Sequence, residues 1–230
     1  MRRRTAMAAV ATFVAFLAVL LSTRIGHQWF DLSGHAFAVH HRTVSSARLA
    51  RTLTQGGSTR IVWPLIVVSA FAFGRGGPIR RLVTAAFVIG GCGCAIWARL
   101  LISDVVRRPR PPLFDWAGTA GGFAFPSGHT TAATLGAGML AWALTRHLTG
   151  RRAHVAVWII AAGYALTVGL TRWWLGVHWP TDVLGGWLFA SSWLLTMRSI
   201  ELLLPRRRER SVSPRAVDEQ AGIEMQRHPS

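Results

Sequence analysis

The chain has 230 residues, of which 51% are hydrophobic and 15% are charged. A soluble domain carries about 25% charged residues. The charges here lie in short segments between long uncharged ones, which is typical of integral membrane proteins. The net charge of +17 comes from arginine alone, because the sequence contains no lysine. A nucleic-acid-binding domain needs a basic patch on a soluble fold. The sequence carries no signature of such a fold, so we expect no nucleic-acid partner.

Six apolar segments predict an all-α, polytopic membrane bundle with six transmembrane helices. A span needs about 20 mostly apolar residues, and the second segment is the shortest of the six. The segments are Thr5–Ser22, Ile61–Gly74, Leu82–Ile102, Thr130–Thr145, Val155–Thr171 and Val183–Leu204. The length favours one membrane-embedded domain over residues 1–205. Residues 206–230 are predicted to form a tail that is first basic and then disordered.

The positions of the arginines predict the orientation of the chain. Arginines cluster at the N-terminus, in the loops after the second and fourth segments, and after the sixth. With six spans these four regions fall on one side, and cytoplasmic regions are enriched in arginine. We therefore expect a multi-pass cell-membrane protein with both termini in the cytoplasm. The first outer segment also carries arginines, and its aromatic residues are compatible with an interfacial helix.

The outer segments after the third and fifth spans carry an unusual set of polar residues. The first contains RRPRP at 107–111 and FPSGH at 125–129, directly before the fourth span. The second contains Arg172, His178 and Asp182. Both segments lie on the same side of the predicted bundle, so we expect an active site at its extracytoplasmic end.

These residue types suit phosphoryl transfer. The guanidinium fork of arginine matches phosphate oxygens and keeps its charge. A glycine beside a serine at a helix N-terminus brings backbone N–H groups and a favourable dipole to an anion. One imidazole can attack phosphorus while a second protonates the leaving oxygen. A carboxylate that accepts the other ring N–H fixes the tautomer of the attacking imidazole.

The motifs resemble the type-2 phosphatidic acid phosphatase superfamily, whose signature is K-x6-R-P, then P-S-G-H, then S-R-x5-H-x3-D. The second part is complete at 126–129, and the third is complete from Arg172 to Asp182, with Thr171 in place of the serine. Of the first part, Arg110 and Pro111 match. The resemblance runs from about the third span to the sixth. It implies a metal-independent, cofactor-free phosphatase that hydrolyses a lipid phosphate monoester or lipid diphosphate within the membrane. Phosphatidate, phosphatidylglycerol phosphate and polyprenyl diphosphate are the substrate classes left open.

The resemblance also implies a role for each site residue. His178 is the expected nucleophile, Asp182 orients it, and His129 protonates the leaving group. The remaining matched residues are expected to hold the phosphate oxygens, and they are Arg110, Ser127, Gly128 and Arg172.

One departure concerns the lysine of the first motif, because Ser103 stands at that position. Arg99 lies four residues earlier, on the same face of a continuing helix, and is expected to bind phosphate in place of the lysine. The substitution also supports an alternative of another class, a catalytically impaired membrane protein that binds or moves phospholipid. A haloperoxidase activity, known in the same superfamily, has less support because those members are mostly soluble.

The sequence assigns no chemistry to several other polar and aromatic residues. Arg107 and Arg108 are interpreted as solvated or headgroup-facing charges. The tryptophans Trp173, Trp174 and Trp179 are interpreted as an interfacial belt. Five of the histidines outside the motifs are assigned no function, and they are His35, His40, His41, His147 and His154.

Overall fold

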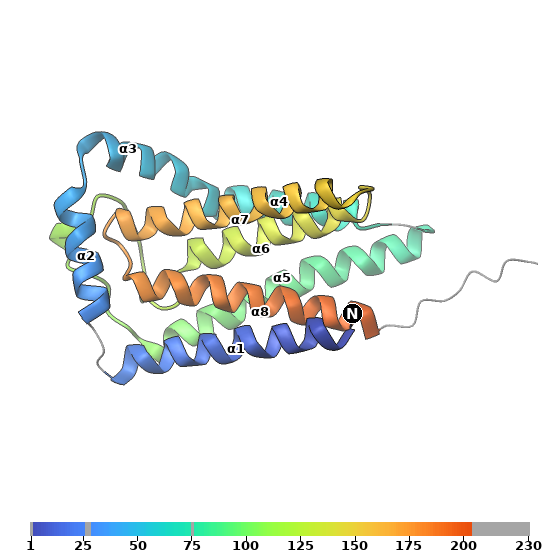
Figure 1. The fold of residues 1–230 in the computed structure, drawn as a ribbon, viewed down its shortest axis with the longest axis horizontal. Helices are drawn as coiled ribbons and strands as arrows, with labels where there is room; N and C mark the ends of the chain where they lie inside the picture. The colour runs from blue at the N-terminus through green and yellow to red at the C-terminus, as the bar shows by residue number, and fades with distance from the viewer. Residues whose placement is uncertain (1, 26–28, 75, 204–230) are drawn as a thin grey trace, which may run out of the picture.

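The computed structural model describes residues 2–25, 29–74 and 76–203, and its regular elements in that part of the chain are all helices. Six helices run side by side and alternate in direction (Figure 1). They are α1 (Arg2–Ile25), α4 (Thr59–Ala72), α5 (Pro78–Val106), α6 (Gly128–Thr145), α7 (Arg151–Trp174) and α8 (Pro180–Leu203). Each one overlaps one of the six predicted segments, so the predicted α-helical class is confirmed.

Two shorter helices and a 3-10 turn cover one end of the bundle. They are α2 (Trp29–His41), α3 (Val44–Leu53) and η1 (Thr54–Gly57). In Figure 1, α2 lies across the end of the bundle where α1 finishes and α8 begins. Thr43 starts α3 with a capping box, in which its side chain accepts from the backbone N–H of Ser46. The first outer segment is therefore helical, as expected, and covers one end of the bundle; an interfacial position for it stays a prediction.

The helices differ according to their place in the bundle. α6 contacts α4, α5, α7 and α8, and most of its residues are buried. Its glycines, alanines and threonines allow this crowding, since small residues let helix backbones approach closely. A Cβ on Gly138, for example, would lie 2.4 Å from the Leu194 side chain. A central helix of this kind needs no apolar outer face.

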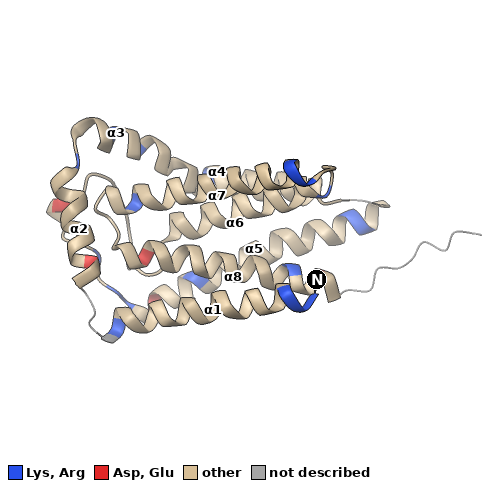
Figure 2. Ribbon diagram, in the orientation of Figure 1, with Lys and Arg blue, Asp and Glu red and all other residues tan. Residues whose placement is uncertain are grey.

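Three of the described helices are long and apolar enough to cross a membrane, and their apolar windows are mostly unburied within the bundle. They cover Arg2–Arg24, Pro78–Val106 and Arg151–Trp174. An apolar surface of this extent, turned away from the protein, matches a hydrocarbon environment. Figure 2 shows the charged residues gathered toward the two ends of the bundle. The predicted tail over 206–230 lies outside the described residues.

Candidate active site

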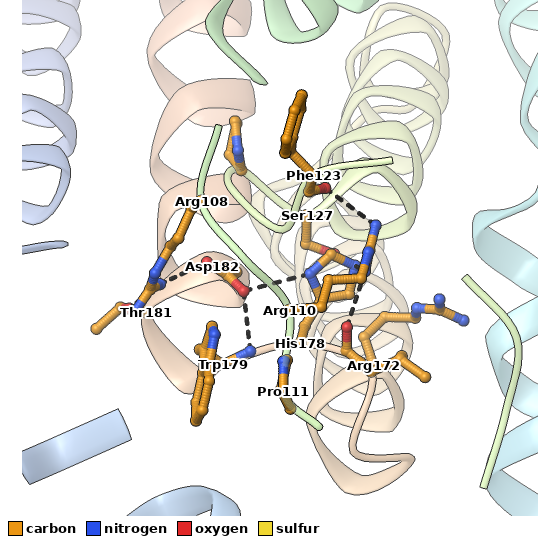
Figure 3. A network of polar contacts seen from close by, with 12 residues as sticks. Arg108, Arg110, Pro111, Phe123, Ser127, Arg172, His178, Trp179, Thr181 and Asp182 are labelled. Carbon is orange, nitrogen blue, oxygen red and sulfur yellow. Dashed lines mark hydrogen bonds and ion pairs between the residues drawn. The ribbon is translucent and has the colours of Figure 1, made fainter. Parts of the chain in front are cut away.

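The polar motifs meet at the end of the bundle that α2 and α3 cover. Figure 3 shows Arg110, Ser127, Arg172, His178 and Asp182 close together there. The loop between α5 and α6 and the turn between α7 and α8 form this end. The backbone N–H of Ser127 donates to the carbonyl of Asp182 at 3.0 Å, which ties the start of α6 to the start of α8. Gly186 permits this close approach, because a Cβ there would lie 3.0 Å from the carbonyl oxygen of Ser127.

His178 is buried, with its two ring nitrogens facing groups of opposite charge. Its Nε2 lies 2.9 Å from Nη1 of Arg110, and its Nδ1 lies 3.4 Å from Oδ2 of Asp182. A guanidinium can only donate, so Nε2 is the accepting nitrogen and the ring proton is on Nδ1. This tautomer directs the lone pair of Nε2 away from Asp182. The Nδ1–Oδ2 contact is longer than an ordinary hydrogen bond.

The electrostatic surroundings keep the His178 ring neutral. Burial lowers the pKa of His178 well below its ordinary value of 6.5, and the nearby positive charges, led by Arg110, lower it further. Burial also lowers the pKa of Arg110 to about 10, although the charge of Asp182 opposes this shift. At neutral pH the site therefore holds a neutral imidazole beside a charged guanidinium.

Asp182 is fully buried at the start of α8, which begins at Pro180, between the two residues of the motif. Its Oδ2 accepts from the backbone N–H of Trp179 at 2.9 Å. Its Oδ1 accepts from Nη1 of Arg108. Hydrogen bonds to both oxygens therefore fix the orientation of the carboxylate that faces His178.

The interpretation of Arg108 as a solvated charge is wrong. Its side chain is only 10% exposed, and its two Nη atoms form ion pairs with Asp182 and Asp31. Asp31 comes from α2, is 3% exposed, and also accepts from the backbone N–H of Thr181 at 3.0 Å. An aspartate inside the apolar start of α2 was the available signal, since such a group requires a partner. The neighbouring Arg107 is exposed and closes α5 in a left-handed conformation, with φ of 50°.

Arg110 lies in the site, but its hydrogen bonds are already made. Nε donates to the carbonyl of Gly122, Nη2 to the carbonyls of Gly121 and Phe123, and Nη1 to that of Val177. With the contact to His178, every N–H of this guanidinium has a partner. Arg110 thus shapes the loop between α5 and α6, and only a displaced contact would free it for phosphate.

Arg172 and Arg99 keep donors that have no hydrogen-bond partner in the described structure. Arg172 is 2% exposed, and its Nη1 and Nη2 donate to Thr54 and Thr119, while its buried Nε has no partner. Nε of Arg99 donates to the carbonyl of Pro126 at 2.9 Å. The Nη atoms of Arg99 lie 3.4 and 3.5 Å from where a Cβ on Gly128 would be. Arg99 therefore reaches the P-S-G-H motif, where its face of α5 was expected to place it.

Ser127, Gly128 and His129 form the entry into α6. Ser127 is the N-cap residue, is fully buried, and its Oγ accepts from Oγ1 of Thr130 at 2.9 Å. The first backbone N–H groups of α6 lie within this site, where a helix N-terminus favours an anion. His129 packs against Gly57, since a Cβ on that glycine would lie 2.8 Å from Cβ of His129. The 3-10 turn of the cap thus packs directly against the backbone and Cβ of His129.

Several tryptophans and one histidine to which the sequence assigns no chemistry form hydrogen bonds near the site. Trp173 and Trp174 fasten the cap, because their Nε1 atoms donate to the carbonyl of Gly34 and to Oγ of Ser46. Nε1 of Trp179 donates to the carbonyl of Pro109 in the loop between α5 and α6. The position of the three tryptophans in an interfacial belt stays a prediction. His35 Nε2 lies 2.9 Å from Oδ2 of Asp115 and holds α2 to the loop. No group of three histidine, cysteine, aspartate or glutamate side chains in the described residues could hold a metal ion.

Comparison with known proteins identifies the family of this chain. A family model described as the PAP2 superfamily matches residues 81–203, which is more than half of the chain. The structure also resembles the crystal structure of a transmembrane PAP2 type phosphatidylglycerolphosphate phosphatase from Bacillus subtilis. That likeness has a TM-score of 0.74 at 25% identity and covers 87% of this chain and 98% of the solved one.

Three curated relatives are similar in sequence. Phosphatidylglycerophosphatase B of Bacillus subtilis is 38% identical over 37% of this chain and 42% of its own length. Undecaprenyl-diphosphatase of Sulfolobus acidocaldarius is 36% identical over 30% of this chain and 29% of its own length. Decaprenylphosphoryl-5-phosphoribose phosphatase of Mycolicibacterium smegmatis is 35% identical over 60% of this chain and 69% of its own length. The match thus spans less than half of the first two relatives.

Proposed function

Because this chain belongs to the PAP2 superfamily of membrane lipid phosphatases, we propose that it hydrolyses a lipid phosphate monoester or lipid diphosphate through a phosphohistidine. The observation that carries the proposal is the arrangement around His178. A neutral imidazole presents Nε2 to the end of the bundle where Arg99 and Arg172 keep unpaired donors. A buried cluster of cationic donors without a counter-ion suits a phosphate group.

In the first step, Nε2 of His178 attacks phosphorus and forms the N–P bond. Burial lowers the pKa of His129 to about 4 before substrate binds, and the positive charges of Arg172 and Arg110 contribute, so the ring takes up its proton from the bound phosphate monoanion. The bond from phosphorus to the lipid oxygen then breaks, and His129 passes this proton to that oxygen. Asp182 accepts the Nδ1–H of His178, stabilises the positive charge that develops on the ring, and keeps the attacking nitrogen unprotonated. Unpaired donors of Arg172 and Arg99 and the N–H groups at Gly128, with the Ser127 hydroxyl, bind the phosphate oxygens.

Arg110 controls access to the attacking nitrogen in this step. Its Nη1 lies 2.9 Å from the nitrogen that must attack, in the direction from which phosphorus approaches. An incoming phosphate oxygen replaces that contact and accepts the freed N–H. Substrate therefore exposes the nucleophile by taking its hydrogen-bond donor.

In the second step, the now neutral His129 removes a proton from water, and the water oxygen attacks the phosphohistidine. The N–P bond breaks, inorganic phosphate leaves, and Nε2 regains its lone pair. Both steps use side chains of this chain only, so the proposed activity requires no metal or cofactor.

The proposed topology places six spans in the membrane, with the site at the extracytoplasmic end and both termini in the cytoplasm. Support comes from the alternating direction of the six helices, since an even number of crossings returns the chain to its starting side. The arginines at the N-terminus and between α6 and α7 lie at the end remote from the site, as cytoplasmic arginines would.

The test is phosphate release by the purified full-length protein from a panel of lipid phosphates in mixed micelles. The panel contains phosphatidate, phosphatidylglycerol phosphate and a polyprenyl diphosphate, with excess EDTA present throughout. We expect release from at least one of these substrates and none with the His178→Ala variant. Tight binding of the lipids by a correctly folded protein without any release would support the alternative, a lipid-binding protein without turnover.

A further inference from the structure

A second candidate site lies at the end of the bundle remote from His178. A cavity of about 720 Å³ separates the second half of α6 from the first half of α7 and the second half of α8. Small-molecule sites have volumes of roughly 300–1,000 Å³. The cavity shares no lining residue with the candidate active site, and the tight contact of Gly138 with Leu194 borders it on one side.

The walls of this cavity combine apolar side chains with Thr145, His154 and Ser191, and one wall reaches the outer surface of the bundle. Trp142, Leu194 and Leu195 line the interior, and Trp158 of α7 is 46% exposed. In a membrane-embedded bundle, the surface beside α7 borders hydrocarbon rather than water. The occupant that reaches the cavity from this side is therefore a lipid chain.

The end of the cavity nearest the helix termini is charged. Arg146 of α6 and Arg198 of α8 both line it, and both form ion pairs with Glu201. Two guanidiniums share a single carboxylate, so one positive charge remains uncompensated. Their side chains are 28% and 25% exposed, and only Nη1 of each donates to Glu201.

Aromatic rings hold the two guanidiniums in place. Cζ of Arg198 lies 5.4 Å from the ring centroid of Trp142, and Cζ of Arg146 lies 5.2 Å from that of Phe73. Such stacking orients an arginine without using its N–H donors. Each guanidinium thus keeps donors for an anion at the mouth of an apolar cavity. Basic pockets between transmembrane helices bind the head groups of anionic lipids.

We propose that this cavity binds an anionic phospholipid of the surrounding membrane, with its phosphate at Arg146 and Arg198 and an acyl chain along Trp142 and Trp158. The lipid is a ligand and not a substrate, because its phosphate lies at the opposite end of the bundle from His178. The proposal requires only that the bundle is embedded in a membrane. It holds whether or not the chain is a phosphatase.

The test uses tryptophan quenching by phosphatidylglycerol with brominated acyl chains, added to the full-length His178→Ala protein in neutral detergent micelles. This background prevents turnover. Phosphatidylcholine with the same brominated chains is the lipid control. We expect a saturable component of quenching with phosphatidylglycerol only. Its amplitude should fall when Trp158 is replaced by phenylalanine and fall further when Trp142 is replaced as well.

Two kinds of variant separate the charged and the apolar contributions. Arg198→Gln should weaken the apparent affinity for phosphatidylglycerol about tenfold, as expected for the loss of one charged contact. Ser191→Phe, which fills the cavity and leaves every charge in place, should abolish the saturable component. Arg80→Gln removes an exposed arginine outside the cavity and should leave the affinity unchanged.

Equal quenching by the two lipids, or unchanged affinity in both Arg198→Gln and Ser191→Phe, would overturn the proposal. Glycerol phosphate added in excess distinguishes a lipid site from a site for a water-soluble phosphate. Displacement of the lipid by this headgroup alone would show a site for a water-soluble phosphate and would contradict the lipid assignment. Phosphate release, measured separately on the protein with His178 intact, decides the proposed function independently.

Discussion

The two ends of the bundle hold their arginines in different ways. At the site end, Arg108 and Arg110 are bound by carboxylates, backbone carbonyls and a histidine before any substrate arrives. At the remote end, Arg146 and Arg198 share the carboxylate of Glu201 and stack over aromatic rings. Preorganised charges stabilise a transition state without reorganisation at the moment of reaction. The guanidiniums at the remote end use fewer of their N–H donors within the protein, so they keep donors for a ligand, and substitutions at the two ends should have different consequences.

The largest expected effect is that of His178→Ala. Removal of the nucleophile should reduce turnover by roughly 10⁶-fold, as for nucleophiles in other enzymes that form covalent intermediates. The measurement is phosphate release, together with acid-labile labelling of the protein by a radioactive phosphate ester. Arg152→Gln removes an exposed charge at the remote end and should match the unsubstituted protein. Labelling that persists in His178→Ala would show another nucleophile.

Replacement of His129 by alanine should cost roughly 10²–10⁴-fold, the usual contribution of a general acid. The loss should depend on the leaving group, because a lipid alkoxide needs the proton and a nitrophenolate leaves without it. The comparison is the rate on an alkyl phosphate against that on p-nitrophenyl phosphate. Equal losses on the two substrates would remove His129 from the role of general acid.

Arg108→Gln and Arg107→Gln form a matched pair of adjacent substitutions. Arg108→Gln leaves Asp31 and Asp182 without their shared cation, so we expect the free energy of unfolding to fall by about 3–5 kcal/mol. In the folded fraction kcat should fall about 10²-fold, because the ring of His178 loses its orientation, while KM changes little. Arg107 is exposed, and Arg107→Gln should change neither quantity.

The double variant Arg108→Gln with Asp31→Asn tests the physical reason. Removal of the charge on Asp31 as well should recover part of the lost stability, since the two groups are coupled. It should not recover kcat, because Asp182 remains without Arg108. Thermal unfolding and steady-state kinetics on the same preparations measure the two effects. Strictly additive losses of stability would contradict a direct ion pair.

A smaller effect is expected from Arg99→Ala, which removes unpaired donors near Gly128. One charge-assisted hydrogen bond contributes about 1.5–3 kcal/mol, so kcat/KM should fall at least about tenfold. Ser103→Lys in the same background should restore part of this loss, since it supplies a cation from the same face of α5. Unchanged kinetics in Arg99→Ala would mean that this arginine serves only to bind the carbonyl of Pro126.

The smallest expected change is in the pH dependence. The folded-state pKa of His178 is lowered, so the ring stays neutral and nucleophilic as the pH falls through its ordinary value of 6.5. In the His129→Ala variant with p-nitrophenyl phosphate, kcat/KM should therefore hold through pH 6.5 and decline only in more acid solution. By linkage, the stability from this neutral ring is present above 6.5 and is lost as the pH falls below it. An acid limb centred at 6.5 would contradict the burial of His178.

Local sequence patterns determined the helices and most of the candidate site. Apolar segments of sufficient length located all six long helices, because the period and length of such segments are visible in one dimension. Motif spacing identified His129, Arg172, His178 and Asp182 as candidate site residues, and the roles expected of them stay predictions. Arg99 was also found from the sequence, because residues four apart share a helical face.

Only the tertiary structure decided which arginines are free and which are committed. Arg107 and Arg108 are adjacent and chemically identical in the sequence, yet the left-handed turn at Arg107 leaves it exposed and directs Arg108 between two buried carboxylates. One of these, Asp31, lies 77 residues away along the chain. Arg110 is expected from the sequence to hold phosphate oxygens, and only the structure shows that its donors are already taken by carbonyls of two loops and by His178. Partnership of this kind depends on long-range packing, which no local pattern encodes.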